Sequence, residues 1–195
     1  MSALKIADTK NLKNLHISLP LNMTTTLQRP ALNESSEYFR LYINKVAGND
    51  IIAALAEGQK TVEQFCRQIP AEKWDFRYAE GKWNIREVLA HLIDTERVMA
   101  YRALRVARND KTPMPGFEQD DYTQYSNANN RSSESLLAEY MAVRASTLAL
   151  FLNFDEEMFG RIGTASGHPA SARASAYIIA GHEIHHLAII KEKYL

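Results

Sequence analysis

The sequence predicts an all-α protein, a four-helix bundle, on three observations. Four long segments carry apolar residues at intervals of three and four, the spacing that forms one face of an α-helix. Almost no segment alternates apolar and polar residues as a half-buried strand would. The chain has 195 residues, enough for one domain with a single hydrophobic core. We therefore expect four helices that pack their apolar faces together.

Residues 1–30 are expected to precede this bundle as a poorly packed leader. The leader contains three lysines but no apolar run long enough for the core of a signal peptide. Met23 is an alternative start of the protein. The bundle is then a single domain over residues 31–195, and residues 37–46 are expected to form a short helix at its beginning.

Capping residues and helix breakers delimit the first two long helices. The first is expected to follow Asn49 or Asp50 as its N-cap and to end before Pro70. The second is expected to begin after Asn84 and to run to about residue 109. Asn84 can cap this helix while Glu87, three residues later, reaches back to it, as in a capping box.

The second half of the chain supplies the other two long helices and two connections. Residues 110–131 contain two prolines, a glycine and an acidic patch, and are long enough for a crossover between the second and third helices or for a lid. The third helix is expected over residues 132–154. The glycines and the proline of residues 159–169 predict a turn region, and the fourth helix follows from residue 171 or 172 to the C-terminus.

Charge and cysteine content exclude several classes of function. The 23 Lys and Arg residues balance the 23 Asp and Glu residues, whereas a nucleic-acid-binding protein needs an excess of clustered basic residues. No segment approaches the length and hydropathy of a membrane span. The only cysteine, Cys66, excludes an intrachain disulfide and a cysteine-rich zinc module, and fits a location in the cytoplasm. Because Cys66 lies in an apolar stripe, we expect an inert thiol there.

Three histidines on predicted helices form a candidate metal site. His182 and His186 are four residues apart, so both imidazoles emerge on one face of the fourth helix and can reach one metal ion. His91 lies on the flank of the apolar stripe of the second helix and can converge on the same point. Three protein ligands leave one position of a tetrahedral ion open, as in catalytic zinc sites. His185 points elsewhere, and ordinary packed histidines are the alternative for the whole set.

The segment around this pair also matches the metalloprotease pattern H-E-x-x-H, in which the Glu is a general base. We interpret the match as accidental, because such enzymes take their third ligand from further downstream and only nine residues follow His186. The third ligand must come from upstream.

Two glutamates, Glu96 and Glu183, lie on apolar helix faces, where a carboxylate needs a partner. One interpretation is catalytic: either carboxylate would accept a hydrogen bond from a ligand histidine or act as a general base. The other is a structural ion pair with an arginine such as Arg86, Arg97 or Arg144. The sequence leaves both open.

Three stretches resemble one known family: YAEGKWNIREVLAHLIDTER at residues 78–97, TASGHP at 164–169 and AGHEIHHL at 180–187. Together they are similar to the DinB/YfiT-like superfamily of metal-binding four-helix bundles, in particular its DinB_2-type branch, over residues 33–195. The resemblance implies a divalent metal, commonly zinc or nickel, held by His91, His182 and His186. Members with assigned activities include transferases and isomerases that use low-molecular-weight thiols such as bacillithiol, mycothiol or glutathione, and dimers are common.

These observations predict a cytoplasmic metal-dependent enzyme that acts on a small molecule as a homodimer. The leading hypothesis is a thiol-dependent S-transferase, because a metal converts a bound thiol into a nucleophilic thiolate at neutral pH. A metal-dependent hydrolase is the second hypothesis, since bound water would become the nucleophile instead. A non-catalytic metal-binding or stress-related bundle is the third.

Overall fold

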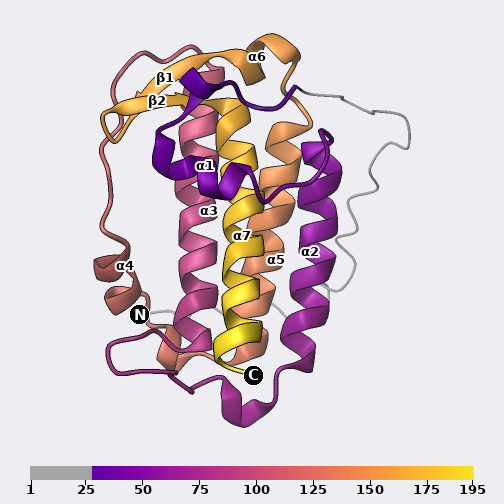
Figure 1. The fold of residues 1–195 in the computed structure, drawn as a ribbon, viewed down its shortest axis with the longest axis vertical. Coiled ribbons are helices and arrows are strands. Elements are labelled where there is room, and N and C mark those ends of the chain that lie inside the picture. The colour runs from indigo at the N-terminus through magenta and orange to yellow at the C-terminus, as the bar shows by residue number, and fades with distance from the viewer. Residues whose placement is uncertain (1–27) are drawn as a thin grey trace, which may run out of the picture.

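The computed structural model describes residues 28–195, and four long helices dominate it (Figure 1). Their bounds are Ile51–Gln68 for α2, Ile85–Ala107 for α3, Ser133–Phe151 for α5 and Ala172–Lys193 for α7. The predicted four-helix bundle is therefore confirmed. Most of the predicted leader, including Met23, lies outside the described residues. At its end, Arg29 donates hydrogen bonds to the carbonyl oxygens of Ile43 and Val46, both at 2.7 Å.

Each long helix begins at a side chain that accepts a hydrogen bond from the first turn. Asp50, Asn84, Ser132 and Ser171 are the four N-caps. At α3 the bond is reciprocal, because the backbone N–H of Asn84 donates to the Glu87 carboxylate at 2.9 Å. These residues satisfy backbone N–H groups that have no partner inside the helix, so local sequence fixes where each helix starts.

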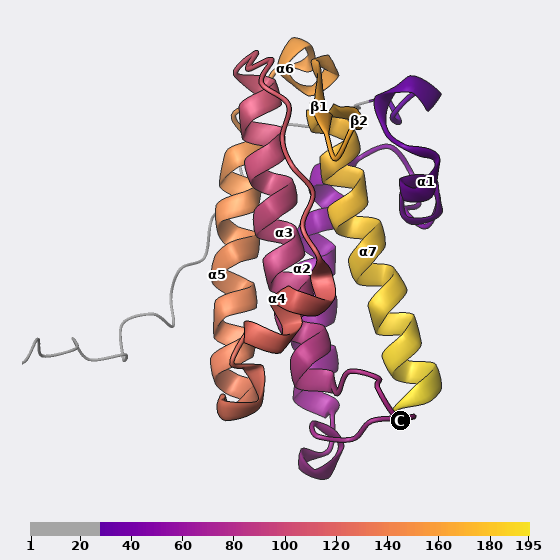
Figure 2. The same cartoon turned by 90° about the vertical axis from the view of Figure 1, so that its left-hand side faces the viewer.

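The order of the helices requires a long crossover, the first of the two alternatives that the sequence left open for residues 110–131. α3 and α5 are consecutive long helices, yet they lie side by side and run in the same direction. The chain between them returns along the length of the bundle before α5 begins, as Figure 2 shows. This crossover contains the short helix α4 (Gln119–Tyr125) and the 3₁₀ helix η4 (Ala128–Asn130). α7 packs against α3, and α2 packs against both α5 and α7.

The region predicted only as a turn forms a β-hairpin. β1 (Ile162–Ala165) pairs in antiparallel register with β2 (His168–Ser171), after the short helix α6 (Glu156–Gly160). The linking residues Ser166 and Gly167 both have positive φ, at 52° and 77°, as a tight two-residue hairpin turn requires. Met114 of the crossover adds backbone hydrogen bonds to Thr164 and Ser166, both at 2.9 Å. Strands of four residues are too short to show alternation, so the sequence did not predict them.

The short helix α1 (Glu37–Ile43) lies against α7, at a point where only glycine fits. A Cβ atom on Gly181 would lie 1.9 Å from the carbonyl oxygen of Tyr42. The absence of a side chain on Gly181 therefore lets the two backbones approach, and it brings Tyr42 beside His182, with ring centroids 5.2 Å apart. In the described part of the chain, no helix combines the length and the apolar character needed to cross a membrane.

Candidate metal centre

The three predicted histidines meet in the interior of the bundle. His182 and His186 come from adjacent turns of α7, and His91 comes from α3, which packs against it. The Nε2 atom of His182 lies 3.0 Å from Nε2 of His91 and 3.0 Å from Nε2 of His186. One ring nitrogen from each residue lies within 4.8 Å of the others. The structure thus brings together the three candidate ligands that the sequence placed on two separate helices.

The chemistry of this cluster fits a divalent cation. Burial lowers the pKa of His91 to about 4 and that of His186 to about 3, and burial together with its histidine neighbours lowers the pKa of His182 well below 6.5. All three imidazoles are therefore neutral at pH 7, the form that binds metal. Nε2 of His182 carries either one proton or one lone pair, so it can complete a hydrogen bond with only one neighbour. Nitrogens around a tetrahedral zinc ion would lie about 3.4 Å apart, which is close to the 3.0 Å from Nε2 of His182 to Nε2 of each of the other two histidines.

Neighbouring groups hold the histidines in place. The hydroxyl of Thr95 lies 3.5 Å from Nδ1 of His91, and the Trp83 ring packs on the same imidazole with centroids 4.7 Å apart. His185 packs against Tyr42 and lies outside the cluster. Nε2 is the nitrogen of each of the three histidines that faces the shared space, and at His91 the Thr95 hydroxyl lies beside the other ring nitrogen.

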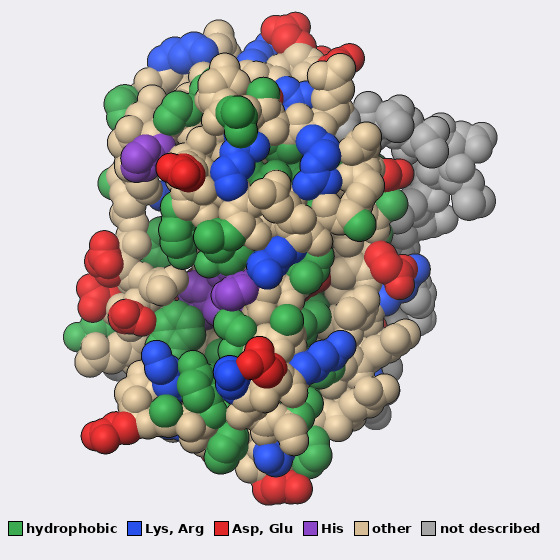
Figure 3. Space-filling view, viewed as in Figure 1, with side chains coloured by type: hydrophobic (Ala, Val, Ile, Leu, Met, Phe, Trp, Pro, Cys, Tyr) green, Lys and Arg blue, Asp and Glu red, His purple; other side chains and the backbone are tan. Residues whose placement is uncertain are grey.

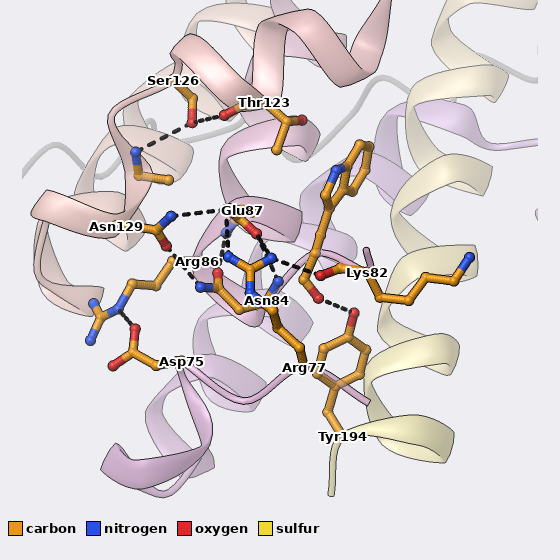
Figure 4. A network of polar contacts seen from close by, with 12 residues as sticks. Asp75, Arg77, Lys82, Asn84, Arg86, Glu87, Thr123, Ser126, Asn129 and Tyr194 are labelled. Atoms are coloured by element: carbon orange, nitrogen blue, oxygen red, sulfur yellow. Dashed lines mark hydrogen bonds and ion pairs between the residues drawn. The ribbon is translucent and has the colours of Figure 1, made fainter. Parts of the chain in front are cut away.

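A polar network fixes the start of α3, two turns before His91 (Figure 4). The Glu87 carboxylate accepts hydrogen bonds from Arg77 at 2.6 and 2.9 Å and from Asn129 at 2.8 Å. Burial opposes the charge on Glu87, but its Arg77 partner and its other hydrogen bonds lower its pKa overall. Asn129 also accepts a hydrogen bond from Asn84 at 2.7 Å, so the network ties the crossover to α3.

The histidines border a cleft of about 270 Å³. Its walls come from α1, α3, α7, the crossover and the hairpin turn, and they include Tyr38, Phe39, Tyr42, Thr95, Met99, Arg102, Phe117, Ser166 and Ile178. Figure 3 shows histidine side chains at mid-height of one face, among hydrophobic ones. His91 and His182 line this cleft, so a molecule inside it can approach two of the three candidate ligands.

Glu96 and Glu183 form a buried ion-pair network with Arg144. Arg144 donates to both carboxylate oxygens of Glu96 at 2.9 Å and to Glu183 at 2.6 Å, while the Tyr140 hydroxyl also donates to Glu183. Among the described residues, neither glutamate makes a hydrogen bond to a histidine. The structural ion pair that the sequence offered as one alternative is formed, with Arg144 as the partner. A catalytic role for either glutamate remains a prediction. Burial raises the pKa of Glu183, against the effect of Arg144.

The other predicted arginine partners are used elsewhere. Arg86 pairs with Asp75 at 2.8 Å, and Arg97 pairs with Glu139 at 2.6 Å. Because Glu183 is held by Arg144, it does not face the histidine nitrogens as the base of an H-E-x-x-H protease would. A cavity of about 10 Å³ is lined by His182 and Thr95 together with Glu96, Glu183 and Arg144.

Cys66 is buried, and burial raises the pKa of its thiol to about 12. It is therefore not a nucleophile at neutral pH. The sequence reasoning missed the residues of the cleft wall, including Arg102. A spacing signal was present, since Arg102 follows His91 by three helical turns on one face of α3.

Comparison with known proteins identifies the family. Residues 54–190 match the family described as the DinB superfamily. This chain belongs to the DinB superfamily. A curated relative from Oceanobacillus iheyensis, named "Putative metal-dependent hydrolase OB0413", is 30% identical over 117 residues, which are 58% of this chain and 66% of the relative. The matched part thus spans just under two thirds of that relative's length.

The fold of this superfamily member also matches a solved structure, YfiT from Bacillus subtilis. That protein is described as "a probable metal-dependent hydrolase with an unusual four-helix bundle topology". The TM-score is 0.64 at 18% sequence identity, and the match covers 85% of this chain and 91% of YfiT. At this identity the comparison establishes the fold alone.

Proposed function

We propose that this protein is a metal-dependent enzyme that joins the sulfur of a low-molecular-weight thiol to a small electrophile. The observation that carries the proposal is the convergence of three neutral imidazoles beside a cleft: His91 and His182 are buried, and His186 is half-buried. Three ligands leave a divalent ion, zinc or nickel, with an open position. The cytoplasm as location and a homodimer as the assembled form belong to the same proposal.

The reaction would need little proton transfer from the protein. A divalent ion bound by the three imidazoles would lower the pKa of a thiol or a water molecule at its open position. The thiolate sulfur then forms a bond to the electrophilic carbon, the leaving group departs with its electron pair, and the thiol proton passes to solvent. Glu96 and Glu183 are occupied by Arg144, so no buried carboxylate among the described residues touches the histidines as a ready base. This arrangement favours a nucleophile that needs only metal activation.

The protein's own residues supply the enclosure for this step. Tyr42, Phe39 and Phe117 give the cleft aromatic walls, and Met99 and Ile178 add aliphatic ones. Such walls exclude water from a reacting thiolate and reduce competing hydrolysis of the electrophile.

A metal-dependent hydrolase is the second candidate, because the names of both similar proteins contain that activity. In that case bound water replaces the thiol as nucleophile. Hydrolysis of an amide also requires a proton for the leaving amine. The hydroxyl groups of Tyr38 and Tyr42, 3.1 Å apart at the cleft, are the nearest candidates for that role.

Metal content tests the first part of the proposal. Elemental analysis of untagged protein is expected to give about one zinc or nickel ion per chain. His91→Ala, His182→Ala and His186→Ala are each expected to lose the metal while circular dichroism still shows a helical protein. His185→Ala is the matched control, because His185 is adjacent in sequence but outside the cluster. Full metal retention in the three variants would refute the site.

Turnover separates the candidate activities. Conjugation of monochlorobimane with bacillithiol or glutathione, lost on chelation and in His182→Ala, supports the S-transferase. Thiol-independent hydrolysis of p-nitrophenyl acetate, lost in the same variant, would replace it with the hydrolase. A metal whose removal unfolds the chain, with neither activity, would indicate the non-catalytic bundle.

A further inference from the structure

Arg102 lines the same cleft as His91 and His182, three helical turns further along α3 than His91. It follows His91 by eleven residues on α3, so the two side chains project from one face of the helix. Eleven residues correspond to about 16 Å along the helix axis. Arg102 lines the cleft although only 4% of its surface is exposed.

Arg102 is a buried cation without an anionic partner among residues 28–195. Its Nη2 atom donates to two neutral acceptors, the carbonyl oxygen of Pro115 at 2.8 Å and the hydroxyl of Ser166 at 3.0 Å. Its Nη1 atom lies 4.0 Å from the sulfur of Met99, and the guanidinium lies over the Phe117 ring, 5.9 Å from the ring centroid, so all of these contacts are with uncharged groups. No hydrogen bond from Nε and no ion pair to a described carboxylate is formed. Burial lowers the pKa of this guanidinium, and no described carboxylate offsets the effect.

Arg144 shows how the same fold treats a buried arginine with a structural role. It is 1% exposed and is neutralised by Glu96 and Glu183. An uncompensated buried charge is destabilising, so a cation left without a counter-ion at the wall of a cleft indicates that the counter-ion comes with a ligand. The carboxylates of Glu118 and Asp120 also line the cleft, but they are exposed at its rim, where water screens them.

We propose that Arg102 binds a carboxylate on the substrate or on the thiol, while the reacting group lies at the histidine end of the cleft. This inference rests on the proposed function, because the histidines define the reacting end. The ligand class is an elongated monoanion with a metal-binding group at one end and a carboxylate at the other. Met99 and Ile178 line the cleft beside these two ends, so the body of such a ligand would contact apolar side chains.

The test uses two probes of equal chain length, 8-mercaptooctanoate, which ends in a carboxylate, and 8-mercapto-1-octanol, which ends in an uncharged hydroxyl. Binding to the full chain is followed by NMR titration of ¹⁵N-labelled protein, both after zinc loading and after EDTA treatment. The carboxylate is expected to bind about ten-fold more tightly than the alcohol in both forms, because a charge-assisted hydrogen bond is gained. Equal affinities in the wild-type protein would overturn the proposal.

Variants assign the preference to Arg102. Arg102→Met is expected to abolish the preference for the carboxylate while the alcohol still binds. Arg102→Gln removes the charge but keeps donors for Pro115 and Ser166, so it gives the same answer if the Met variant does not fold. Arg108→Met is the matched control, because it removes an equal charge from an exposed arginine at the end of the same helix. A preference that persists without the Arg102 charge would also overturn the proposal.

Zinc separates this inference from the proposed function. Zinc loading is expected to tighten both probes, because both carry the thiol. Zinc without effect on either probe would count against the thiol-dependent metal site, whereas the difference between the probes reports on Arg102 alone.

Discussion

Replacement of Arg144 by Met is the strongest perturbation that the structure suggests outside the histidine cluster. Arg144 is 1% exposed and pairs with Glu96 and Glu183, and it also donates to the carbonyl oxygen of Leu55 at 2.8 Å. Its removal leaves two buried carboxylates without a counter-ion. Removal of one partner from a buried ion pair costs about 3–5 kcal/mol, a large share of the roughly 5–15 kcal/mol that stabilises a domain. We expect Arg144→Met to lose at least about 3 kcal/mol at pH 7.

Urea unfolding followed by circular dichroism measures this loss. With an m-value of about 2 kcal/mol/M, the midpoint should fall by about 1.5–2.5 M. The control is the triple variant Arg144→Met, Glu96→Gln, Glu183→Gln, which removes the charges together and should recover much of the stability. A loss below about 1 kcal/mol would refute the reasoning.

The stability of the single variant Arg144→Met should depend on pH in a characteristic way. Burial already raises the pKa of Glu183 in the presence of Arg144, and without this cation the pKa should rise further. A carboxyl group whose folded pKa exceeds its unfolded value binds its proton better in the folded state, so stability falls as the pH rises through that range. The difference in free energy of unfolding between Arg144→Met and the wild-type protein should therefore narrow as the pH falls from 8 to 5, by up to about 1.4 kcal/mol per pH unit. A difference that does not change with pH would contradict this account.

Two further predictions concern the histidines and the contact between α1 and α7. In metal-free protein the pKa values of His91, about 4, and His186, about 3, lie below the ordinary 6.5. Below pH 6.5 the unfolded chain therefore binds protons that the folded chain does not. The contribution of the two histidines to the free energy of unfolding is fully present above pH 6.5 and is lost progressively as the pH falls below it. At pH 5 each histidine should cost about 2 kcal/mol, and equal urea midpoints for EDTA-treated protein at pH 7 and 5 would contradict this. Gly181→Ala forces α1 away, because its Cβ would lie 1.9 Å from the Tyr42 carbonyl oxygen, and we expect a loss of about 1–3 kcal/mol in thermal unfolding. Ala188→Ser, at an exposed site on the same helix, should leave the melting temperature unchanged.

The elements of the fold that depend on local sequence could be predicted from it. Asn84 and Glu87 form the expected capping box, and Asp50 caps α2 as one of two predicted candidates. Such contacts join residues three positions apart, so the sequence contains both partners. The hairpin was not predicted, because its pairing depends on Ser166 and Gly167 at positive φ and on the distant Met114, and not on an alternation of apolar and polar residues.

The sequence by itself determined which side chains share a helix face. It placed His182 beside His186, because helical spacing alone fixes that relation. Tertiary structure decided that His91 joins them, since the rotation and axial shift of α3 against α7 depend on side-chain packing along both helices. It also decided that Arg144, among three candidate arginines, neutralises Glu96 and Glu183, and that Arg102 has no such partner among the described residues. Charge compensation in the interior depends on which distant groups come within hydrogen-bond distance, and only the packed bundle sets those distances.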